Sequence, residues 1–243
     1  MKLKLISCDV FIRSVCQEIA LTGHIVDPEF TPLGAHENPN TLRDMIQSKI
    51  DQAEGKGYDA ILLAYGLCGN SAVGLKARSI PLIIPRAHDC CTILLGSRQR
   101  FLECFKDNLS GRWSSVGYME RGASYLHDTD TGKLLGLNRE YEEYVRLYGK
   151  ENADFIWETL HPKDTNTELI YIETPGLEHL GYLEKFEKEA SKEGKTVLVL
   201  QGDTKLIHGL LHGNWDEEEY QIVFPGKTIK AIYDHEKIFC AGE

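Results

Sequence analysis

Three continuous apolar runs, each as long as a β-strand, constrain the fold of this chain more than any other feature. They are DAILLAY (59–65), IPLIIP (80–85) and TVLVL (196–200). A strand that is apolar on both faces has to be covered on both faces, which is typical of parallel sheets flanked by helices. Segments with helical spacing separate these runs along the chain. We therefore predict an α/β protein with a Rossmann-like, mainly parallel sheet and helices on both faces.

The other predicted elements continue this alternation. The extended segments are 2–7, 24–33, 112–118, 168–173, 221–224 and 228–233, and the helices are 11–21, 41–53, 90–109, 138–160, 177–193 and 204–212. The last two extended segments flank a Pro-Gly turn and are expected to pair with each other. Residues 66–74 are expected to form a turn that leads into a short helix, and residues 122–136 a loop or hairpin. We treat 1–243 as one α/β domain, with 1–110 and 165–243 as candidate halves joined by a less regular middle.

Composition and charge narrow the choice of partners. The chain carries 27 Lys and Arg residues against 37 Asp and Glu residues, a formal net charge of −10. Nucleic-acid binding needs clustered basic residues, so we expect no nucleic-acid partner. No apolar run approaches the ~18–20 residues of a membrane-spanning helix, and the opening MKLKLISCDV lacks the long apolar stretch of a signal peptide. We therefore expect a cytoplasmic protein with no membrane partner.

Seven cysteines are more than a core usually needs, and several of them fall at strand ends. Their odd number and the expected reducing compartment argue against a disulfide framework. Cys8 follows the first strand, Cys68 follows 59–65, and the segment 88–91 follows 80–85. In parallel α/β sheets, ligands bind at the carboxyl ends of the strands, so we expect these side chains to meet in one crevice.

Thiolates and an imidazole are suitable ligands for Zn²⁺ or an iron–sulfur cluster. The candidate metal ligands are Cys8, Cys68, His88, Cys90 and Cys91, and Asp9 and Asp89 are expected to lie just behind them. His88 and Cys90 are two residues apart, so an extended segment would present both to one ion. No CxxC motif is present, and the sequence leaves open which of the two adjacent cysteines faces the crevice. A reactive thiol and a set of buried core cysteines are the alternatives.

The segment 66–74 (GLCGNSAVG) and Arg86 are candidates for substrate binding. Glycines allow a ligand to approach the backbone closely, so Gly66, Gly69 and Asn70 are expected to cradle a ligand beside the cysteine in this loop. The alternative is a tight turn after the strand. Arg86 would bind a substrate carboxylate, or would pair with an aspartate. No GxGxxG motif follows the first strand and no P-loop motif is present, which disfavours nucleotide binding.

Two histidines of the predicted helix 204–212 have a spacing that suits a metal. His208 and His212 are four residues apart and share one helix face. The sequence shows no third ligand beside them, so we expect a surface or packed pair. Asp203 is expected to cap this helix. Cys16 and Cys104 fall within predicted helices and are expected to be core residues.

Three adjacent motifs resemble one family. The stretches YGLCGN (65–70), RAHDCC (86–91) and LLGSRQRF (94–101), with QGDTKLIHGLLHGNWD (201–216), are similar to the family called domain of unknown function 1638. The chain departs from the family pattern at 116–120, where VGYME stands in place of an expected PGW. The positions that match the shared motif are Cys68, His88, Asp89 and Cys90, whereas Cys8 is added from the predicted topology.

The resemblance implies a link to corrinoid chemistry, because members of this family often occur beside corrinoid-dependent methyltransferase genes. An HxC pair with a distant cysteine is also similar to the zinc site of corrinoid:thiol methyltransferases, although their barrel fold differs from the sheet predicted here. We therefore expect a metal-binding protein in which zinc activates a thiol for methyl transfer. One alternative is an iron–sulfur protein for electron transfer or corrinoid reactivation. The other is a non-enzymatic accessory protein that binds a corrinoid or a methyltransferase subunit.

Overall fold

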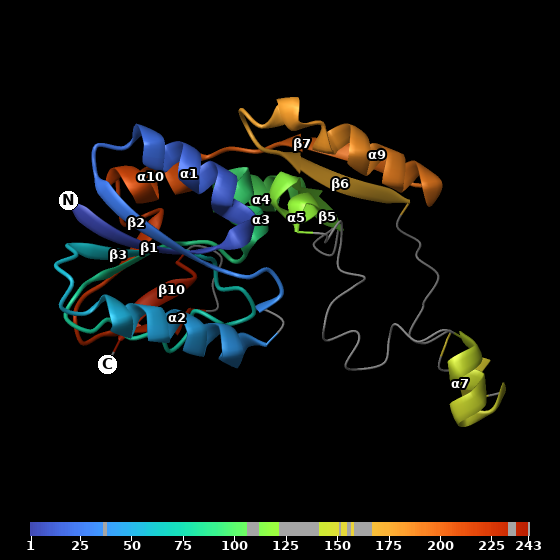
Figure 1. Ribbon diagram of the computed structural model, residues 1–243, viewed down its shortest axis with the longest axis horizontal. Helices are drawn as coiled ribbons and strands as arrows, with labels where there is room; N and C mark the ends of the chain where they lie inside the picture. Colours follow the sequence, from blue (N-terminus) through green and yellow to red (C-terminus); the bar gives the residue numbers. More distant parts are fainter. Residues whose placement is uncertain are drawn as a thin grey trace.

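The computed structural model describes residues 1–35, 38–105, 112–121, 141–150, 152–154, 157, 167–232 and 237–242. It confirms the predicted α/β class, with a mostly parallel central sheet between helices (Figure 1). The strands of that sheet are β2 (Ile25–Thr31), β1 (Lys2–Cys8), β3 (Ala60–Ala64), β4 (Leu82–Pro85) and β8 (Tyr220–Val223), in this order. The first four are parallel, and β8 is an antiparallel edge strand.

The order of the strands creates a switch point between β1 and β3. The chain leaves β1 for β2 on one side and continues through β3 to β4 on the other. Open α/β sheets bind ligands where the direction of winding reverses, outside the carboxyl ends of the two strands. All five residues of β3 are buried, as the apolar run predicts.

Helices cover both faces of the central sheet. α1 (Ile12–Leu21) and α10 (Lys205–His212) lie side by side on one face, and α2 (Pro39–Ala53) covers the other (Figure 1). α2 begins where Asn38 Oδ1 accepts hydrogen bonds from the backbone N–H groups of Asn40 and Thr41, both at 3.2 Å. α10 approaches β8 closely, because Gly209 has no side chain and Tyr220 donates its hydroxyl hydrogen to Leu206 O at 2.8 Å.

A second, three-stranded parallel sheet lies beside the first. Its strands are β5 (Trp113–Ser115), β6 (Glu168–Glu173) and β7 (Thr196–Gln201). α9 (Tyr182–Lys192) packs on it through Phe186, whose ring centroid lies 5.4 Å from that of Tyr171. After β7 the chain returns to the central sheet through α10 and β8, so the described strands of the candidate half 165–243 do not form one sheet.

The remaining described elements are short. They are η1 (Asp9–Phe11), α3 (Cys90–Leu95), α4 (Arg98–Phe105), α5 (Val116–Glu120), α7 (Tyr141–Tyr148), η3 (Glu178–Leu180), β9 (Thr228–Ala231) and β10 (Phe239–Gly242). None of the described helices has the length and apolar character needed to cross a lipid bilayer.

Several predicted elements differ from the structure. The predicted pairing of 221–224 with 228–233 is wrong: β8 pairs with β4, and β9 pairs with β10. The predicted helix 90–109 is interrupted at Gly96, whose φ of 83° ends α3. The segment 66–74 leads into an isolated bridge between Lys76 and Thr228 and not into a helix. Cys16 is exposed and Cys104 only half-buried, so neither is the core residue we expected.

Other predictions are met in part. The predicted strand 112–118 is β5 followed by the first residues of α5, and the predicted helix 138–160 is described only in part, as α7 and a few further residues. The predicted loop 122–136 lies outside the described residues.

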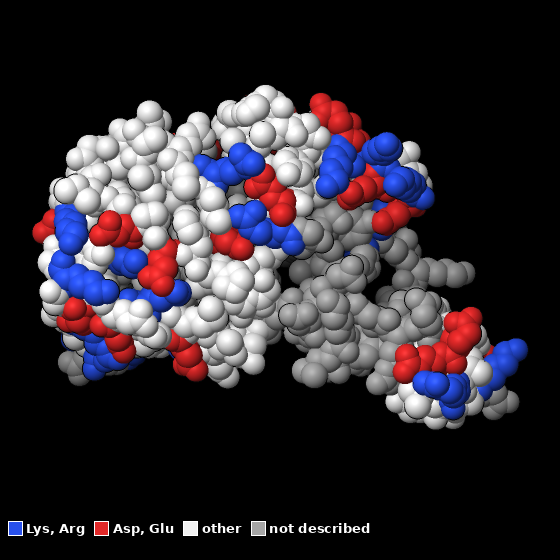
Figure 2. Space-filling model, viewed as in Figure 1, with Lys and Arg blue, Asp and Glu red and all other residues white. Residues whose placement is uncertain are grey.

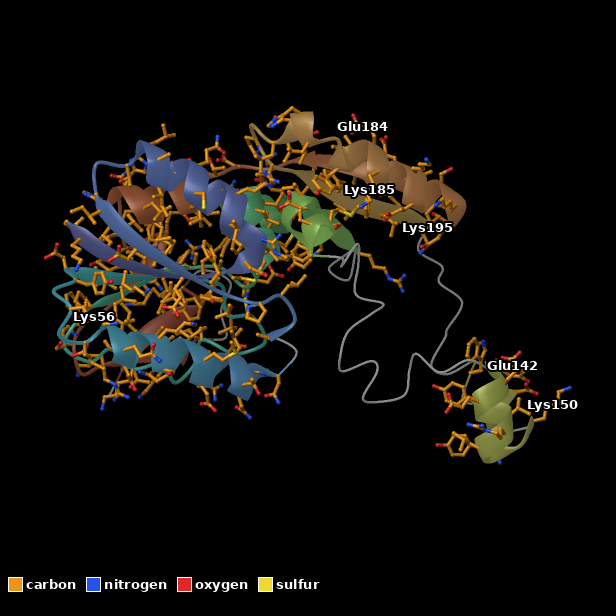
Figure 3. The ribbon with its side chains drawn as sticks, viewed as in Figure 1. Lys56, Glu142, Lys150, Glu184, Lys185 and Lys195 are labelled. Atoms are coloured by element: carbon orange, nitrogen blue, oxygen red, sulfur yellow. The ribbon has the colours of Figure 1, made fainter. Side chains whose placement is uncertain are left out.

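Charged side chains of both signs share the visible surface. On the face shown in Figure 2, Lys and Arg lie beside Asp and Glu wherever charged residues gather, and the upper left of the described surface is largely uncharged. Figure 3 labels Glu184 and Lys185 on α9, where the Lys185 ammonium lies 5.8 Å from the Tyr182 ring centroid. Lys56, in the turn after α2, accepts a hydrogen bond at its carbonyl from Lys2 Nζ at 2.9 Å. This last contact ties the start of β1 to the turn before β3.

We expect Gly117→Ala to destabilise the fold strongly. A Cβ at this position of α5 would lie 1.9 Å from the carbonyl oxygen of Val10 in η1, so one of the two backbones would have to move. Overpacking against backbone of this kind costs about 3 kcal/mol. Urea denaturation measures the loss, and Gly23→Ala, which meets no atom within 4 Å, is the matched control. Equal stability of the two variants would contradict the packing described here.

Candidate functional site

Three cysteines from three strand exits meet at the switch point of the central sheet. Cys8 is the last residue of β1, Cys68 lies in the loop after β3, and Cys90 is the first residue of α3. The Cys90 side chain lies next to those of both Cys8 and Cys68 and interacts with their thiols. Cys8 and Cys90 are buried, with exposed fractions of 6% and 8%, and Cys68 is partly exposed. The thiol group, as we call these three residues, is therefore reachable from the side of Cys68.

A close approach of two loops builds this arrangement. The N–H of Leu67 donates to Ala87 O at 2.8 Å, and the N–H of Cys68 donates to His88 O at 2.9 Å. A Cβ on Gly66 would lie 2.6 Å from Asp89 N, so only glycine lets the exits of β3 and β4 run side by side. The structure gives Gly66 a positioning role, by which it sets Cys68 opposite Cys90.

The backbone around Cys68 adopts the left-handed conformation. Its φ is 45°, followed by 64° at Gly69 and 71° at Asn70. This region is disfavoured for residues with a Cβ, and such residues cluster at functional sites. Ser71 Oγ donates to Cys68 O at 2.7 Å, and Arg43 donates to Asn70 O at 2.9 Å. These contacts hold the turn that presents the Cys68 thiol.

Asp89 and Cys91 occupy different environments from Cys90. Asp89 Oδ1 accepts hydrogen bonds from the N–H and the hydroxyl of Thr92, at 3.0 and 3.1 Å, and so caps α3. Cys91 has no exposed surface, and burial raises the pKa of its thiol strongly. The structure thus places Cys90 in the thiol group and Cys91 in the core.

Two tyrosines that the sequence analysis did not select border the thiol group. Tyr65 ends the apolar run of β3, and its hydroxyl lies 2.8 Å from Thr31 Oγ1. Tyr118 on α5 is hydrogen-bonded to Cys90 and packs edge-on against Trp113. Burial raises the pKa of both phenols far above the usual range, so both keep their protons. Tyr65 could have been selected from the sequence, because it stands at the end of a predicted strand. Tyr118 had no such signal, since it lies in 116–120, where the chain departs from the family pattern.

Contacts within the thiol group shift the pKa values of Cys8 and Cys90 in opposite directions. The hydrogen bond with Cys90 lowers the pKa of Cys8 more than burial raises it. Hydrogen bonds to Cys68 and Cys8, together with burial, raise the pKa of Cys90 far above its usual range. Cys8 therefore ionises before Cys90, which keeps its proton.

The charged and basic residues predicted near the site are arranged differently from our expectation. Arg86 donates to Glu217 O, Lys237 O, Phe239 O and Gln221 Oε1, at 2.6 to 2.9 Å. These contacts tie β4 to the C-terminal segments and favour a structural role. His88 is half-buried, with its ring centroid 6.5 Å from that of Phe101.

Arg121, which the sequence analysis missed, is the basic residue next to the thiol group. It donates to Asp9 Oδ2 at 3.1 Å and to Asp9 O at 3.2 Å, and Asp9 Oδ1 lies 4.0 Å from Cys8 Sγ. Arg121 also lines an open cleft of about 710 Å³ between α1, α5 and the segment 176–182. Arg13 and Cys16 line the same cleft. Glu120 lines it too, and both arginines are paired with carboxylates: Arg13 with Glu120, and Arg121 with Asp9 and Glu120.

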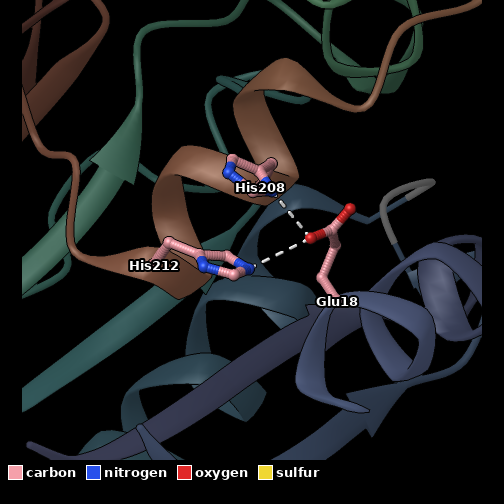
Figure 4. A group of neighbouring side chains, drawn as sticks. All are labelled: Glu18, His208 and His212. Carbon is pink, nitrogen blue, oxygen red and sulfur yellow. Dashed lines mark hydrogen bonds and ion pairs between the residues drawn. The ribbon is translucent and has the colours of Figure 1, made fainter. Parts of the chain in front are cut away.

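A second cluster of potential ligands lies between α1 and α10. His208 Nδ1 and His212 Nε2 lie 2.8 and 3.2 Å from the same oxygen, Oε2 of Glu18 (Figure 4). Glu18 was missed because its partners lie 190 and 194 residues away. A signal was present, since Phe11, Val15 and Glu18 share the buried face of the first helix. A carboxylate on such a face needs a partner.

The two clusters differ in how tightly their ligand atoms converge. In the described part of the chain, Glu18, His208 and His212 form the group of candidate ligands whose atoms all lie within 4.8 Å of one another. The three sulfur atoms of the thiol group do not all lie within 4.8 Å of one another, so they form an open row with Cys90 in the middle.

The fold and its thiol group define an α/β protein with a cysteine cluster at the switch point of a parallel sheet. The family described as "Protein of unknown function (DUF1638)" matches residues 30–211, which is most of the chain, and the protein belongs to this family. Cys68 and Cys90 lie within the matched region, and Cys8 lies before it. Searches of curated proteins and of solved structures gave no significant match.

We expect Cys90→Ala to raise the pKa of Cys8 in metal-free protein, because the substitution removes the hydrogen bond that lowers it most. The measurement is the pH dependence of Cys8 alkylation by iodoacetamide, followed by mass spectrometry. The midpoint should move to higher pH in Cys90→Ala, and less in Cys90→Ser, whose hydroxyl still donates. Cys104→Ala is the control and should leave the midpoint in place. An unchanged or lower midpoint in Cys90→Ala would refute the hydrogen-bonded thiol group.

Proposed function

We propose that Cys8, Cys68 and Cys90 bind a soft metal ion, with zinc as the best fit, at the carboxyl edge of the central sheet. The observation that carries the proposal is the placement of the three cysteines at neighbouring strand exits of one parallel sheet, where backbone hydrogen bonds hold the loop of Cys68 against the segment before Cys90. Thiolates are the preferred ligands of zinc in sulfur-rich sites. Rotation of the side chains about χ1 would close the open row of sulfur atoms around an ion. Three protein ligands would leave one position for His88 or for a substrate.

The surroundings of the thiol group suit the activation of a substrate thiol. A zinc ion at this position would keep a bound thiol ionised as a nucleophilic thiolate. The phenol groups of Tyr65 and Tyr118 stay protonated, so they can donate hydrogen bonds to sulfur. Arg121 and Arg13 border the open cleft, and a substrate with an acidic group would bind them by replacing Glu120 or Asp9 as their partner. In this proposal Arg121 takes the role that the sequence analysis gave to Arg86.

The specific reaction that we propose is methyl transfer from a corrinoid to a thiol. Its support is the family resemblance described above and the thiol-activating character of the site. The thiolate sulfur would form the bond to the methyl carbon, and cobalt would keep the electron pair of the broken bond. We place the protein in the cytoplasm, where a reducing environment keeps the cysteines free. The same three thiols would also suit an iron–sulfur cluster, and the experiment below separates the two.

The metal proposal is tested by cobalt substitution, because thiolate ligands give Co²⁺ an intense ultraviolet charge-transfer band that imidazole and carboxylate do not. We expect the band in the wild-type chain purified without oxygen, and its loss in the double variant Cys68→Ser, Cys90→Ser. Cys16→Ser and Cys104→Ser are the matched controls and should keep the band. Circular dichroism checks that each variant is folded.

Three results would overturn the zinc proposal. A folded double variant with an unchanged band would exclude these cysteines as ligands. Brown protein that contains iron and sulfide would replace zinc with an iron–sulfur cluster on the same residues. A chain with no bound metal and freely titrating thiols would favour the accessory-protein alternative.

The methyl-transfer proposal is tested with methylcobalamin and two thiols, 2-mercaptoethanol and 2-mercaptoethanesulfonate. We expect the zinc-loaded protein to accelerate demethylation of the corrinoid at least tenfold over the reaction without protein, and Cys90→Ser to abolish the acceleration. Arg121→Gln should raise KM for the acidic thiol and leave that for the neutral thiol nearly unchanged. A zinc-loaded protein with no effect on the rate would refute methyl transfer but leave the metal site standing.

A further inference from the structure

We infer that Glu18, His208 and His212 form a second metal site, for a divalent transition-metal ion of the zinc class, between α1 and α10. This site is separate from the thiol group. Cys8 precedes α1, whereas Glu18 lies about 9 Å along that helix from its first residue, at 1.5 Å per residue. The inference rests on the geometry of the cluster and is independent of the function proposed for the cysteines.

The three ligand atoms already converge. Both imidazole nitrogens lie within 3.2 Å of Glu18 Oε2, and all three atoms lie within 4.8 Å of one another (Figure 4). Ligand atoms bound to zinc at about 2.0–2.1 Å in tetrahedral geometry are about 3.4 Å apart, so small side-chain rotations would admit an ion. His208 and His212 reach this point together because they are four residues apart on α10.

The charge balance of the cluster favours a cation. The Glu18 side chain is only 9% exposed, and among the described residues no Lys or Arg is paired with it. Its partners are two imidazoles that stack with their ring centroids 4.0 Å apart. Two protonated imidazoles at that distance would repel each other, whereas neutral imidazoles are good metal ligands. A divalent ion would neutralise the buried carboxylate and leave both rings uncharged.

The two helices add to this preference. Glu18 lies in the last turn of α1, and His212 is the last residue of α10. The two helix ends are adjacent, because Thr22 Oγ1 donates to Leu211 O at 2.9 Å. Carboxyl ends of helices carry partial negative charge and stabilise cations. Both helix dipoles therefore favour a positive ion at this place.

The ligand set and its exposure define the class of ion. Two imidazoles and one carboxylate suit zinc and its neighbours, Fe²⁺, Co²⁺ and Ni²⁺, better than the hard ions Ca²⁺ and Mg²⁺. Three protein ligands leave an open position for water or a small ligand, as in catalytic zinc sites. The His208 side chain is 49% exposed, so this position faces solvent.

The test is a titration of the full-length metal-free chain with Co²⁺, followed by thermal unfolding with and without the ion. In the wild-type chain we expect weak visible absorption from a site without sulfur, and a higher Tm with Co²⁺ because the ion links α1 to α10. Glu18→Gln keeps an oxygen that accepts the histidine hydrogen bonds, so the helix contact remains while the ligand charge is lost. We expect this variant to bind Co²⁺ at this site at least tenfold more weakly and to lose the part of the Tm rise that this site contributes.

His208→Gln, at a half-exposed position, is the second variant and should give the same loss. His179→Gln, on exposed η3, is the control and should bind as the wild type does. Any thiolate charge-transfer band should persist in Glu18→Gln, His208→Gln and His179→Gln. Its persistence would show that the lost Co²⁺ was not bound by the cysteines. Unchanged Co²⁺ stoichiometry, affinity and Tm rise in folded Glu18→Gln and His208→Gln would overturn the inference and leave the cluster as a hydrogen-bonded helix contact.

Discussion

The parallel pairing of β1 with β3 is the constraint on which the candidate thiol site depends. The register runs from Leu3 opposite Ala60 to Ser7 opposite Ala64. β3 is buried over this stretch and β1 is buried except at Lys4, so a shift of one residue would expose apolar side chains or bury the lysine. With the register fixed, Cys8 leaves the sheet next to the exit of β3. Because Gly66 has no side chain, the segment after β4 can approach closely and place Cys90 beside Cys8 and Cys68.

The sequence located the region of the thiol group, because strand exits can be predicted from apolar runs, but it did not separate Cys90 from Cys91. Cys8, Cys68 and Cys90 follow three such runs, and their meeting needs only a parallel sheet. The sequence was not sufficient to locate Tyr118 and Arg121, since their place depends on the contact between Gly117 and the backbone of η1. That contact joins residues more than 100 positions apart and leaves no local pattern.

The same distinction between local and distant signals explains the other differences. β8 and β9 look like a hairpin because a Pro-Gly turn separates them, but β8 has a longer-range partner in β4. Arg86 follows a strand, as a substrate-binding residue would, yet the C-terminal segments supply its acceptors. The histidine spacing on α10 was visible, whereas the carboxylate that completes the cluster comes from α1. Sequence periodicity thus predicts which face of a helix is buried and where a strand ends. Tertiary contacts decide which of these helix faces and strand ends lie together.

The direct test of the thiol centre is X-ray absorption at the zinc edge on chain loaded with one equivalent of Zn²⁺. Thiolate ligands, the softer of the two donor sets, should take the first equivalent. We expect sulfur neighbours at about 2.3 Å, as for zinc bound by cysteines. A spectrum with only nitrogen and oxygen neighbours at about 2.0–2.1 Å would contradict the thiol centre and place the ion at the histidine cluster instead.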